Sequence, residues 1–169
     1  DGGLAKRAPG VKGFEDIVSA ITHTSTYLGS NSVEALLGDA WNWISTTKVL
    51  ADAERCAAAA ILFESLTKID TTTACRLSER VSHDLLHLLT NLKADQILAY
   101  ALHRFACLGR GDAAEVIHRQ IRDPETREKT RITIDLFNEF YLLEDQSLLE
   151  KTLFEHTTKG LEGLSAGII

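Results

Sequence analysis

The chain has 169 residues, of which 44% are hydrophobic and 25% are charged. This length and balance are typical of one globular domain that can bury a core without disulfides or bound metals. Its 18 basic and 24 acidic residues give a net charge of −6, which argues against nucleic acid as a partner. No apolar run approaches the ~20 residues that a membrane-spanning helix needs, so no membrane span is expected.

The three cysteines are Cys56, Cys75 and Cys107, which lie far apart, each in an apolar helical context. An odd number of cysteines without a CxxC pair favours free, buried thiols over disulfides. We therefore expect an intracellular protein in a reducing compartment, either the cytoplasm or the interior of an organelle.

The two ends of the chain differ in composition from the part between them. Residues 1–13 contain four glycines, a proline and a Lys-Arg pair, and they are predicted to form an extended N-terminal arm. Residues 14–160 are predicted to be a single all-helical domain. Residues 161–169 are predicted to be an apolar, glycine-containing tail.

Periodic apolar residues and capping signals predict about eight helices. The clearest start is Asp123-Pro124, where a capping residue precedes a proline at the first helical position. Gly109 is the natural C-cap of the fifth helix. The expected helices begin near these residues: Phe14, Asn31, Asp52, Thr71, Ala94, Asp112, Asp123 and Asp145.

Short gaps between the predicted helices favour an antiparallel arrangement of sequential neighbours. The predicted fold is therefore all-α, with successive antiparallel hairpins in either an irregular helical-repeat array or a globular helical bundle. The starts at Asp112 and Asp145 are 33 residues apart, a spacing typical of two-helix repeats. Residues 100–115 resemble a hairpin of the tetratricopeptide or pentatricopeptide type, although the consensus Trp, Gly, Tyr and Pro of such repeats do not recur at fixed offsets.

His83 and His87 are four residues apart on a predicted helix, so they share one face at a spacing that can clamp a metal ion. The segment His83-Asp84-Leu-Leu-His87 resembles the HExxH motif of zinc proteases, with Asp84 in the place of the glutamate base. The alternative, to which we give more weight, is that both histidines flank an apolar stripe and face solvent or a neighbouring helix. A third ligand would have to come from elsewhere in the chain: His103, His118 or Glu115.

Trp41 and Trp43 are two residues apart, so they point to different sides of a helix and cannot both face one core. One is predicted to lie in the core and the other at a contact with another element or a partner. Ile168 and Ile169, at the end of the glycine-containing tail, are also predicted to be interface residues.

The favoured function is a non-enzymatic interaction or scaffold subunit that acts within a larger assembly of other protein subunits. No nucleophile elbow, phosphate loop or EF-hand pattern is present in the sequence, and no cofactor is expected. The first alternative is a metal-dependent helical hydrolase that uses His83 and His87. The second is an RNA-binding helical-repeat protein that uses residues 119–131, where five basic residues stand among three acidic ones.

Overall fold

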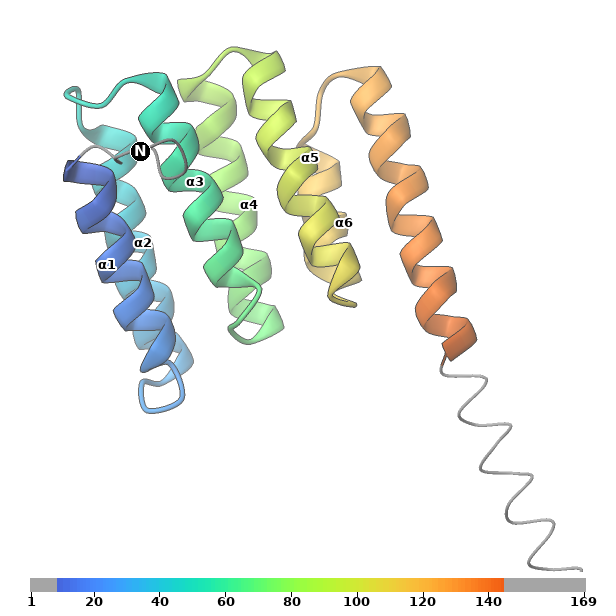
Figure 1. Cartoon of the computed structure of the whole chain (residues 1–169), viewed down its shortest axis with the longest axis horizontal. Helices are drawn as coiled ribbons and strands as arrows, with labels where there is room; N and C mark the ends of the chain where they lie inside the picture. The colour runs from blue at the N-terminus through green and yellow to red at the C-terminus, as the bar shows by residue number, and fades with distance from the viewer. Residues whose placement is uncertain (1–8, 145–169) are drawn as a thin grey trace, which may run out of the picture.

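The structure is a computed structural model that describes residues 9–144 of the chain. These residues form seven helices and no strand (Figure 1), which confirms the predicted all-α class. Seven is one fewer than the predicted number of about eight, and the helix expected to begin at Asp145 lies outside the described residues. The helices are α1 (Pro9–His23), α2 (Ser30–Thr46), α3 (Asp52–Leu66), α4 (Thr71–Leu88), α5 (Asn91–Cys107), α6 (Gly111–Gln120) and a seventh helix over residues 124–144.

The first helix begins earlier than the sequence suggested. Pro9 is the first residue of α1, so residues 9–13 are helical and do not belong to an extended arm. Proline suits this position because its fixed φ is close to the helical value and its missing N–H needs no partner. Val11 is fully buried and anchors this first turn to the core. Residues 1–8 of the predicted arm and the predicted tail at 161–169 lie outside the described residues.

Side-chain caps fix two of the helix starts. The Asp123 carboxylate accepts the backbone N–H of Thr126 at 2.9 Å, as predicted for the start of the seventh helix. Asp70, which the sequence analysis missed, accepts the backbone N–H of Thr73 at 3.0 Å, and this hydrogen bond lowers the pKa of Asp70. In α2, α3 and α6 the N-cap residue lies one or two positions before the expected start, so these residues lie within the first turn: Asn31, Asp52 and Asp112.

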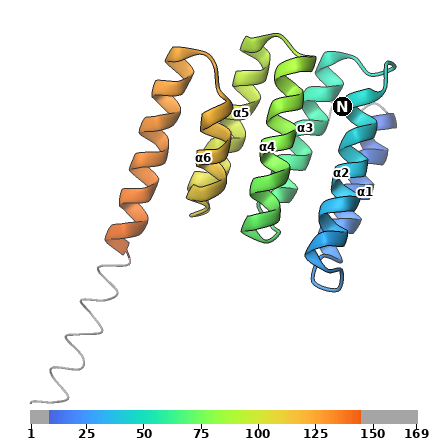
Figure 2. The same ribbon diagram turned by 180° about the vertical axis from the view of Figure 1, so that it is seen from behind.

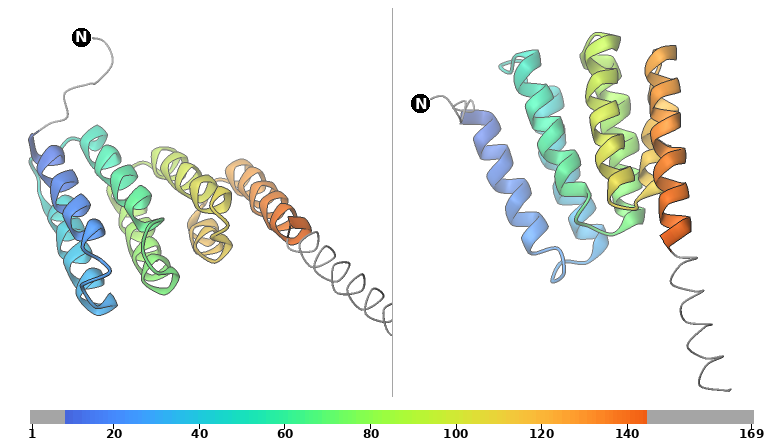
Figure 3. Two further views of the ribbon diagram at one scale, coloured as in Figure 1. Left: turned by 60° about the horizontal axis from the view of Figure 1, so that its bottom comes forward. Right: turned by 45° about the vertical axis from the view of Figure 1, so that its right-hand side comes forward.

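The helices lie in two layers. One layer contains α1, α3, α5 and the seventh helix, and the other contains α2, α4 and α6, as the front and back views show (Figures 1 and 2). Consecutive helices are joined by turns at alternate ends and run antiparallel, and the tilted views show the helix pairs side by side in a row (Figure 3). From α1 to α6, each helix contacts the next helix and the next but one along the chain, but none further along.

The core lies between the two layers and extends from α1 to the seventh helix, which contributes Ile134. Small residues such as Ala58 and Ala59 are fully buried and allow neighbouring helices to approach closely. None of the helices within residues 9–144 has both the length and the apolar character needed to cross a membrane. The largest fully buried side chains include Trp41, Phe63, Phe105, Leu37, Leu62, Leu85, Leu98 and Ile117.

Two bidentate ion pairs connect next-but-one helices across the surface. Arg76 of α4 donates to both carboxylate oxygens of Glu34 in α2, at 2.7–3.1 Å. Arg104 of α5 holds Glu64 of α3 in the same way, at 2.9 and 3.1 Å. The two pairs span 42 and 40 residues of chain respectively, and one lies in each layer.

Candidate functional site

Trp41 and Trp43 lie on opposite sides of α2, as their spacing predicted. Trp41 has no exposed surface, and its indole Nε1 donates a hydrogen bond of 2.8 Å to Oδ2 of Asp84 in α4. Trp43 is 50% exposed. Trp41 is therefore the core residue, and Trp43 is the tryptophan that is available for a contact.

The Trp43 side chain lies in a hollow between α1 and α2. A Cβ atom added to Gly10 would lie only 3.1 Å from Cη2 of Trp43, so the missing side chain lets the indole approach the backbone of α1. The hollow has a volume of ≈310 Å³ and is lined by residues of these two helices alone. We call this surface the N-terminal face, and it consists of Gly10, Gly13, Ile17, Leu36, Ala40 and Trp43.

The N-terminal face is apolar, and part of it remains in water. Ile17, Leu36 and Trp43 are all exposed, and the described residues place no other helix over them. The charges of Lys12 and Asp16 pair with each other at 3.1 Å. The opposite sides of α1 and α2 pack against α3 and α4, so the N-terminal face is the open end of the helical array. The other predicted interface residues, Ile168 and Ile169, lie outside the described residues.

The seventh helix carries a second exposed apolar surface, which the sequence analysis did not separate from the core positions. The four residues of this surface recur at i, i+4, i+8 and i+11, and each side chain is 53–61% exposed. Ile134 of the same helix is fully buried on another side, so the helix has two apolar faces. The sequence itself shows that the exposed residues and Ile134 fall on different sides of the helix. We call the exposed surface the outer stripe, and it consists of Ile132, Leu136, Phe140 and Leu143.

His83 and His87 converge on one exposed face of α4, as their spacing predicted. Their Nε2 atoms are 3.3 Å apart, and the ring centroids are 4.6 Å apart in an edge-to-face arrangement. The Asp84 side chain also points toward α2, where its Oδ2 accepts the hydrogen bond from Trp41. The residue in the place of a catalytic base thus has a structural contact with the core.

The three predicted third ligands lie in other environments. The Nε2 atom of His118 is 3.1 Å from the carbonyl oxygen of Arg127, and Glu115 forms an ion pair with Arg131. The His103 ring lies edge-on to Phe137. No group of three or more His, Cys, Asp or Glu side chains able to hold a metal occurs among residues 9–144. The described part of the chain therefore offers a two-histidine site at most.

The basic residues between 119 and 131 are largely engaged within the chain. Arg131 donates to both oxygens of Glu115 at 2.6 and 3.0 Å, and this hydrogen bonding lowers the pKa of Glu115. Lys129 pairs with Glu125 at 2.7 Å, and Arg127 donates to the carbonyl oxygen of Ile121. Three of the five cations therefore already have acceptors, which leaves a weak surface for phosphate groups.

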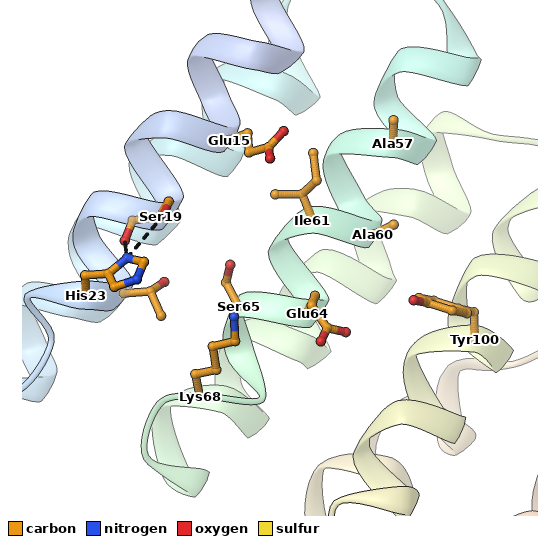
Figure 4. Close-up of a pocket in the computed structure, with 11 residues that line it drawn as sticks. Glu15, Ser19, His23, Ala57, Ala60, Ile61, Glu64, Ser65, Lys68 and Tyr100 are labelled. Atoms are coloured by element: carbon orange, nitrogen blue, oxygen red, sulfur yellow. Dashed lines mark hydrogen bonds between the residues drawn. The ribbon is translucent and has the colours of Figure 1, made fainter. Parts of the chain in front are cut away.

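A groove of ≈430 Å³ crosses the layer formed by α1, α3 and α5 (Figure 4). The small side chains of Ala57 and Ala60 on α3 leave this space open, and Tyr100 of α5 lies at one side. Glu64 contributes a carboxylate whose pKa is lowered by the hydrogen bond from Arg104. The sequence did not indicate this groove, because its lining comes from three separate helices.

The groove contains a serine and a histidine four residues apart, but they do not form a nucleophile and base. Nδ1 of His23 is 2.7 Å from the carbonyl oxygen of Ser19 and 3.3 Å from its hydroxyl (Figure 4). A carbonyl oxygen can only accept, so Nδ1 carries the proton and donates it. That nitrogen is therefore unable to take the proton of the Ser19 hydroxyl.

The cysteines at positions 56, 75 and 107 are free thiols, as predicted, although each is half-buried and not fully buried. Burial, with a smaller contribution from the nearby Asp52 carboxylate, raises the pKa of Cys56. Burial also raises the pKa of Cys75. A raised pKa lowers the thiolate fraction, so neither group has the activation expected of a nucleophilic cysteine.

No protein-family model matches the chain, no curated protein matches it, and no solved structure matches it. Function is therefore inferred from the residues of the chain, their exposure and their contacts.

Proposed function

We propose that the chain is an irregular helical-hairpin repeat array that acts as a non-enzymatic interaction or scaffold subunit of a larger protein assembly. The observation that carries this proposal is the N-terminal face, where Ile17 and Trp43 line an apolar hollow at the open end of the helices and Leu36 is exposed nearby on α2. The partners are other protein subunits. Free thiols at all three cysteines support a reducing intracellular compartment.

The contacts between helices support a repeat array over a globular bundle. In a closed bundle the first and last helices share a core, whereas α1 has no contact with α4, α5 or α6. The ion pairs Glu34–Arg76 and Glu64–Arg104 also join next-but-one helices, one pair in each layer. In arrays of this kind each unit buries its apolar side against its neighbours, and an end unit needs a cap or a partner.

The composition of the N-terminal face is that of a protein contact. Exposed apolar surface costs roughly 25 cal/mol per Å² relative to burial, and contiguous apolar patches on a protein mark interaction sites. Tryptophan is also enriched among the residues that dominate binding energies. The fitting partner is therefore a helix with a matching apolar side chain that enters the hollow beside Trp43.

Substitution of Trp43 tests the proposed assembly directly. The full chain is tagged in its source, isolated gently and weighed by native mass spectrometry as wild type, Trp43→Asp and Tyr27→Asp. Tyr27 is the matched control because it is an aromatic residue that is 89% exposed and lies outside the N-terminal face. We expect the wild type and Tyr27→Asp to have the mass of a larger assembly, and Trp43→Asp to have the mass of the single chain.

Two results would contradict the proposal. A wild-type chain that is isolated at its monomer mass of 18.6 kDa plus the tag would show that no stable assembly forms. A Trp43→Asp chain that stays in the assembly would show that another surface makes the contact. Circular dichroism of both variants checks that the helices are retained.

A second candidate function, a metal-dependent hydrolase, is favoured by the geometry of His83 and His87 alone. Their Nε2 separation of 3.3 Å is close to that of two nitrogen ligands on a tetrahedral zinc ion, roughly 3.3–3.4 Å for bonds of about 2.0–2.1 Å. Elemental analysis of the purified chain and of His83→Ala tests it. Stoichiometric zinc in the wild type that is lost in His83→Ala supports this candidate, and the absence of metal from both rejects it.

A further inference from the structure

His83 and His87 on α4 are arranged as one half of a tetrahedral metal site. Their Nε2 atoms are 3.3 Å apart, whereas the centroids of their rings are 4.6 Å apart. The two nitrogens are therefore closer together than the rings that carry them, and both face one space outside the helix. Two nitrogen ligands of one tetrahedral zinc ion lie about 3.3–3.4 Å apart. The pair thus offers two ligands at the spacing that zinc requires.

The carboxylate of Asp84 gives His83 the surroundings of a metal ligand. Its Oδ1 atom is 3.7 Å from Nδ1 of His83, and its Oδ2 atom accepts the 2.8 Å hydrogen bond from Trp41. The negative charge beside Nδ1 favours the tautomer with the proton on that nitrogen, so the lone pair is on Nε2. Carboxylates in this position orient the histidines of zinc sites. Because Trp41 is fully buried, the core of the array holds the group that orients His83.

Within residues 9–144 the site has two ligands and no more. No group of three or more His, Cys, Asp or Glu side chains able to hold a metal occurs in this part of the chain. A structural zinc site has four protein ligands, and a catalytic site has three with one open position. One histidine pair satisfies neither requirement, but the same pair taken twice completes a tetrahedron of four nitrogens.

The outer face of α4 is accessible to a second copy of the chain. Figure 2 shows α4 in front, between α2 and α6. The side chain of His83 is 64% exposed, and His87 is exposed as well. Both arginines of α4 donate to acceptors on α2, so neither is a free cation beside the histidines. The charges of α4 sum to zero, which avoids net repulsion between two copies of the helix: Arg76, Glu79, Arg80 and Asp84.

We propose that His83 and His87 bind a zinc ion together with the same two residues of a second copy of the chain. The zinc lies on a twofold axis, as a contact between two identical faces requires. It is a structural bridge with four nitrogen ligands and no open position for water, which distinguishes it from the zinc of a hydrolase. Since α4 contributes nothing to the N-terminal face, the bridge does not depend on the partner proposed for Trp43.

Addition of zinc to the purified full chain tests the bridge. The chain is first stripped of metal with EDTA, and its mass is followed by light scattering as zinc chloride is added. We expect saturation at one zinc per two chains and a mass twice the 18.6 kDa of the single chain, and excess EDTA should restore the single chain. His83→Ala and His87→Ala should each lose this doubling, because each substitution removes two of the four ligands.

Two other histidines provide controls. His103 is exposed like His83, and it also has a possible ligand four residues away, since its Nε2 atom is 3.3 Å from Sγ of Cys107. His156 lies outside the described residues. His103→Ala and His156→Ala should both keep the zinc-dependent doubling. Trp43→Asp should keep it too, so this test and that of the proposed assembly can fail separately.

Asp84→Asn tests the positioning role of the carboxylate. Asparagine keeps an acceptor for the Trp41 indole but removes the charge beside His83. We expect the affinity for zinc, measured in competition with a chromogenic chelator, to fall about 10–100-fold, while the melting temperature of the metal-free chain stays close to that of the wild type. An unchanged affinity would contradict the role of Asp84.

Four results would overturn the proposed bridge. One zinc per chain in a monomer would show a site completed within the chain and would favour the hydrolase. A dimer that persists in EDTA or in both His83→Ala and His87→Ala would assign the contact to another surface. Loss of the doubling in His103→Ala or His156→Ala would assign a ligand to that residue. Zinc that binds only in large excess, without a change in mass, would show adventitious binding to an exposed pair.

Discussion

The helix α4 in the middle of the array and the seventh helix at its end place their apolar residues differently. The large apolar residues of α4, including Leu77, Val81 and Leu85, are buried or half-buried, because α4 has α2, α3, α5 and α6 as neighbours. The seventh helix buries Ile134 but exposes the four residues of the outer stripe. In these two helices, the exposure of apolar side chains therefore follows the absence of a neighbouring helix.

The same contrast occurs within α2. Trp41 points toward α4 and has no exposed surface, whereas Trp43 points toward the open end and is half exposed. Two identical side chains two residues apart thus differ in what covers them. The middle of the array stabilises the fold, and its ends carry the apolar surfaces that are available for contacts.

The largest expected effect is the difference in unfolding free energy between substitutions of Trp41 and of Trp43. Trp41→Ala should lower the free energy of unfolding by about 3–5 kcal/mol, because it leaves a cavity in the core and removes the hydrogen bond to Asp84. Trp43→Ala should change it by less than about 1 kcal/mol, because the side chain is already half in water. Urea denaturation followed by circular dichroism measures both values. Similar losses for the two variants would contradict the division between middle and end.

The next effect tests the left-handed backbone after α5, at the point where Tyr141 of the seventh helix packs against it. Gly109 has a φ of +74°, and an added Cβ would lie 3.2 Å from the Tyr141 ring. Gly109→Ala should therefore cost about 1–2 kcal/mol from the left-handed backbone alone. Gly13→Ala is the control, because Gly13 lies inside α1 with an ordinary φ and open space around it. An equal result for the two substitutions in urea denaturation would speak against this geometry.

A stabilising change is expected at the N-terminal face. Gly13 lies in α1, and an added Cβ would meet no atom within 4 Å. Gly13→Ala should raise the free energy of unfolding by about 0.5–1 kcal/mol, because alanine loses less backbone entropy in a helix. The added methyl group should also weaken partner binding, since Gly13 lines the hollow beside Trp43. Denaturation of the isolated chain and native mass spectrometry of the assembly give the two readouts, and a destabilised chain would contradict the open space seen at Gly13.

The smallest expected effect is on the pH dependence of the unfolding free energy. It concerns one ion pair in the middle of the array and one near its end. The Arg104 and Arg131 guanidinium groups lower the pKa values of Glu64 and Glu115 from the ordinary 4.5. A carboxylate with a lowered pKa contributes stability above the ordinary value, and this contribution is lost as the pH falls through the folded value. The unfolding free energy should thus fall below about pH 4.5, and less steeply in Glu64→Gln and in Glu115→Gln. Each effect should stay within about 1 kcal/mol because both pairs are partly exposed, and unchanged acid sensitivity in both variants would contradict this assignment.

Local signals in the sequence predicted much of the fold. The Asp123-Pro124 pair marked a helix start, Gly109 marked a helix end, and the spacing of the two tryptophans placed them on opposite sides. The same kind of signal was present at Pro9, but the glycines around it suggested an arm. Its helical state depends on Val11, whose burial needs a neighbouring helix that the local sequence does not specify.

The candidate sites were less predictable because they depend on the arrangement of several helices. The groove beside Ala57 and Ala60 is formed by three helices. The convergence of His83 and His87 followed from one helical turn, but the lack of a third ligand near them within residues 9–144 depended on the packing of α5 and α6. The outer stripe was detectable in principle, since its residues follow a different phase from Ile134.

Hydroxyl-radical footprinting of the two tryptophans in the native assembly and in the isolated chain is the most direct test of the central claim. Trp41 is an internal control, because it is covered by the fold in both states. The account predicts that Trp43 is oxidised rapidly in the isolated chain and becomes protected, to a level close to that of Trp41, in the assembly. Oxidation of Trp43 at the same rate in both states would contradict the claim that the open end of the array is a subunit contact.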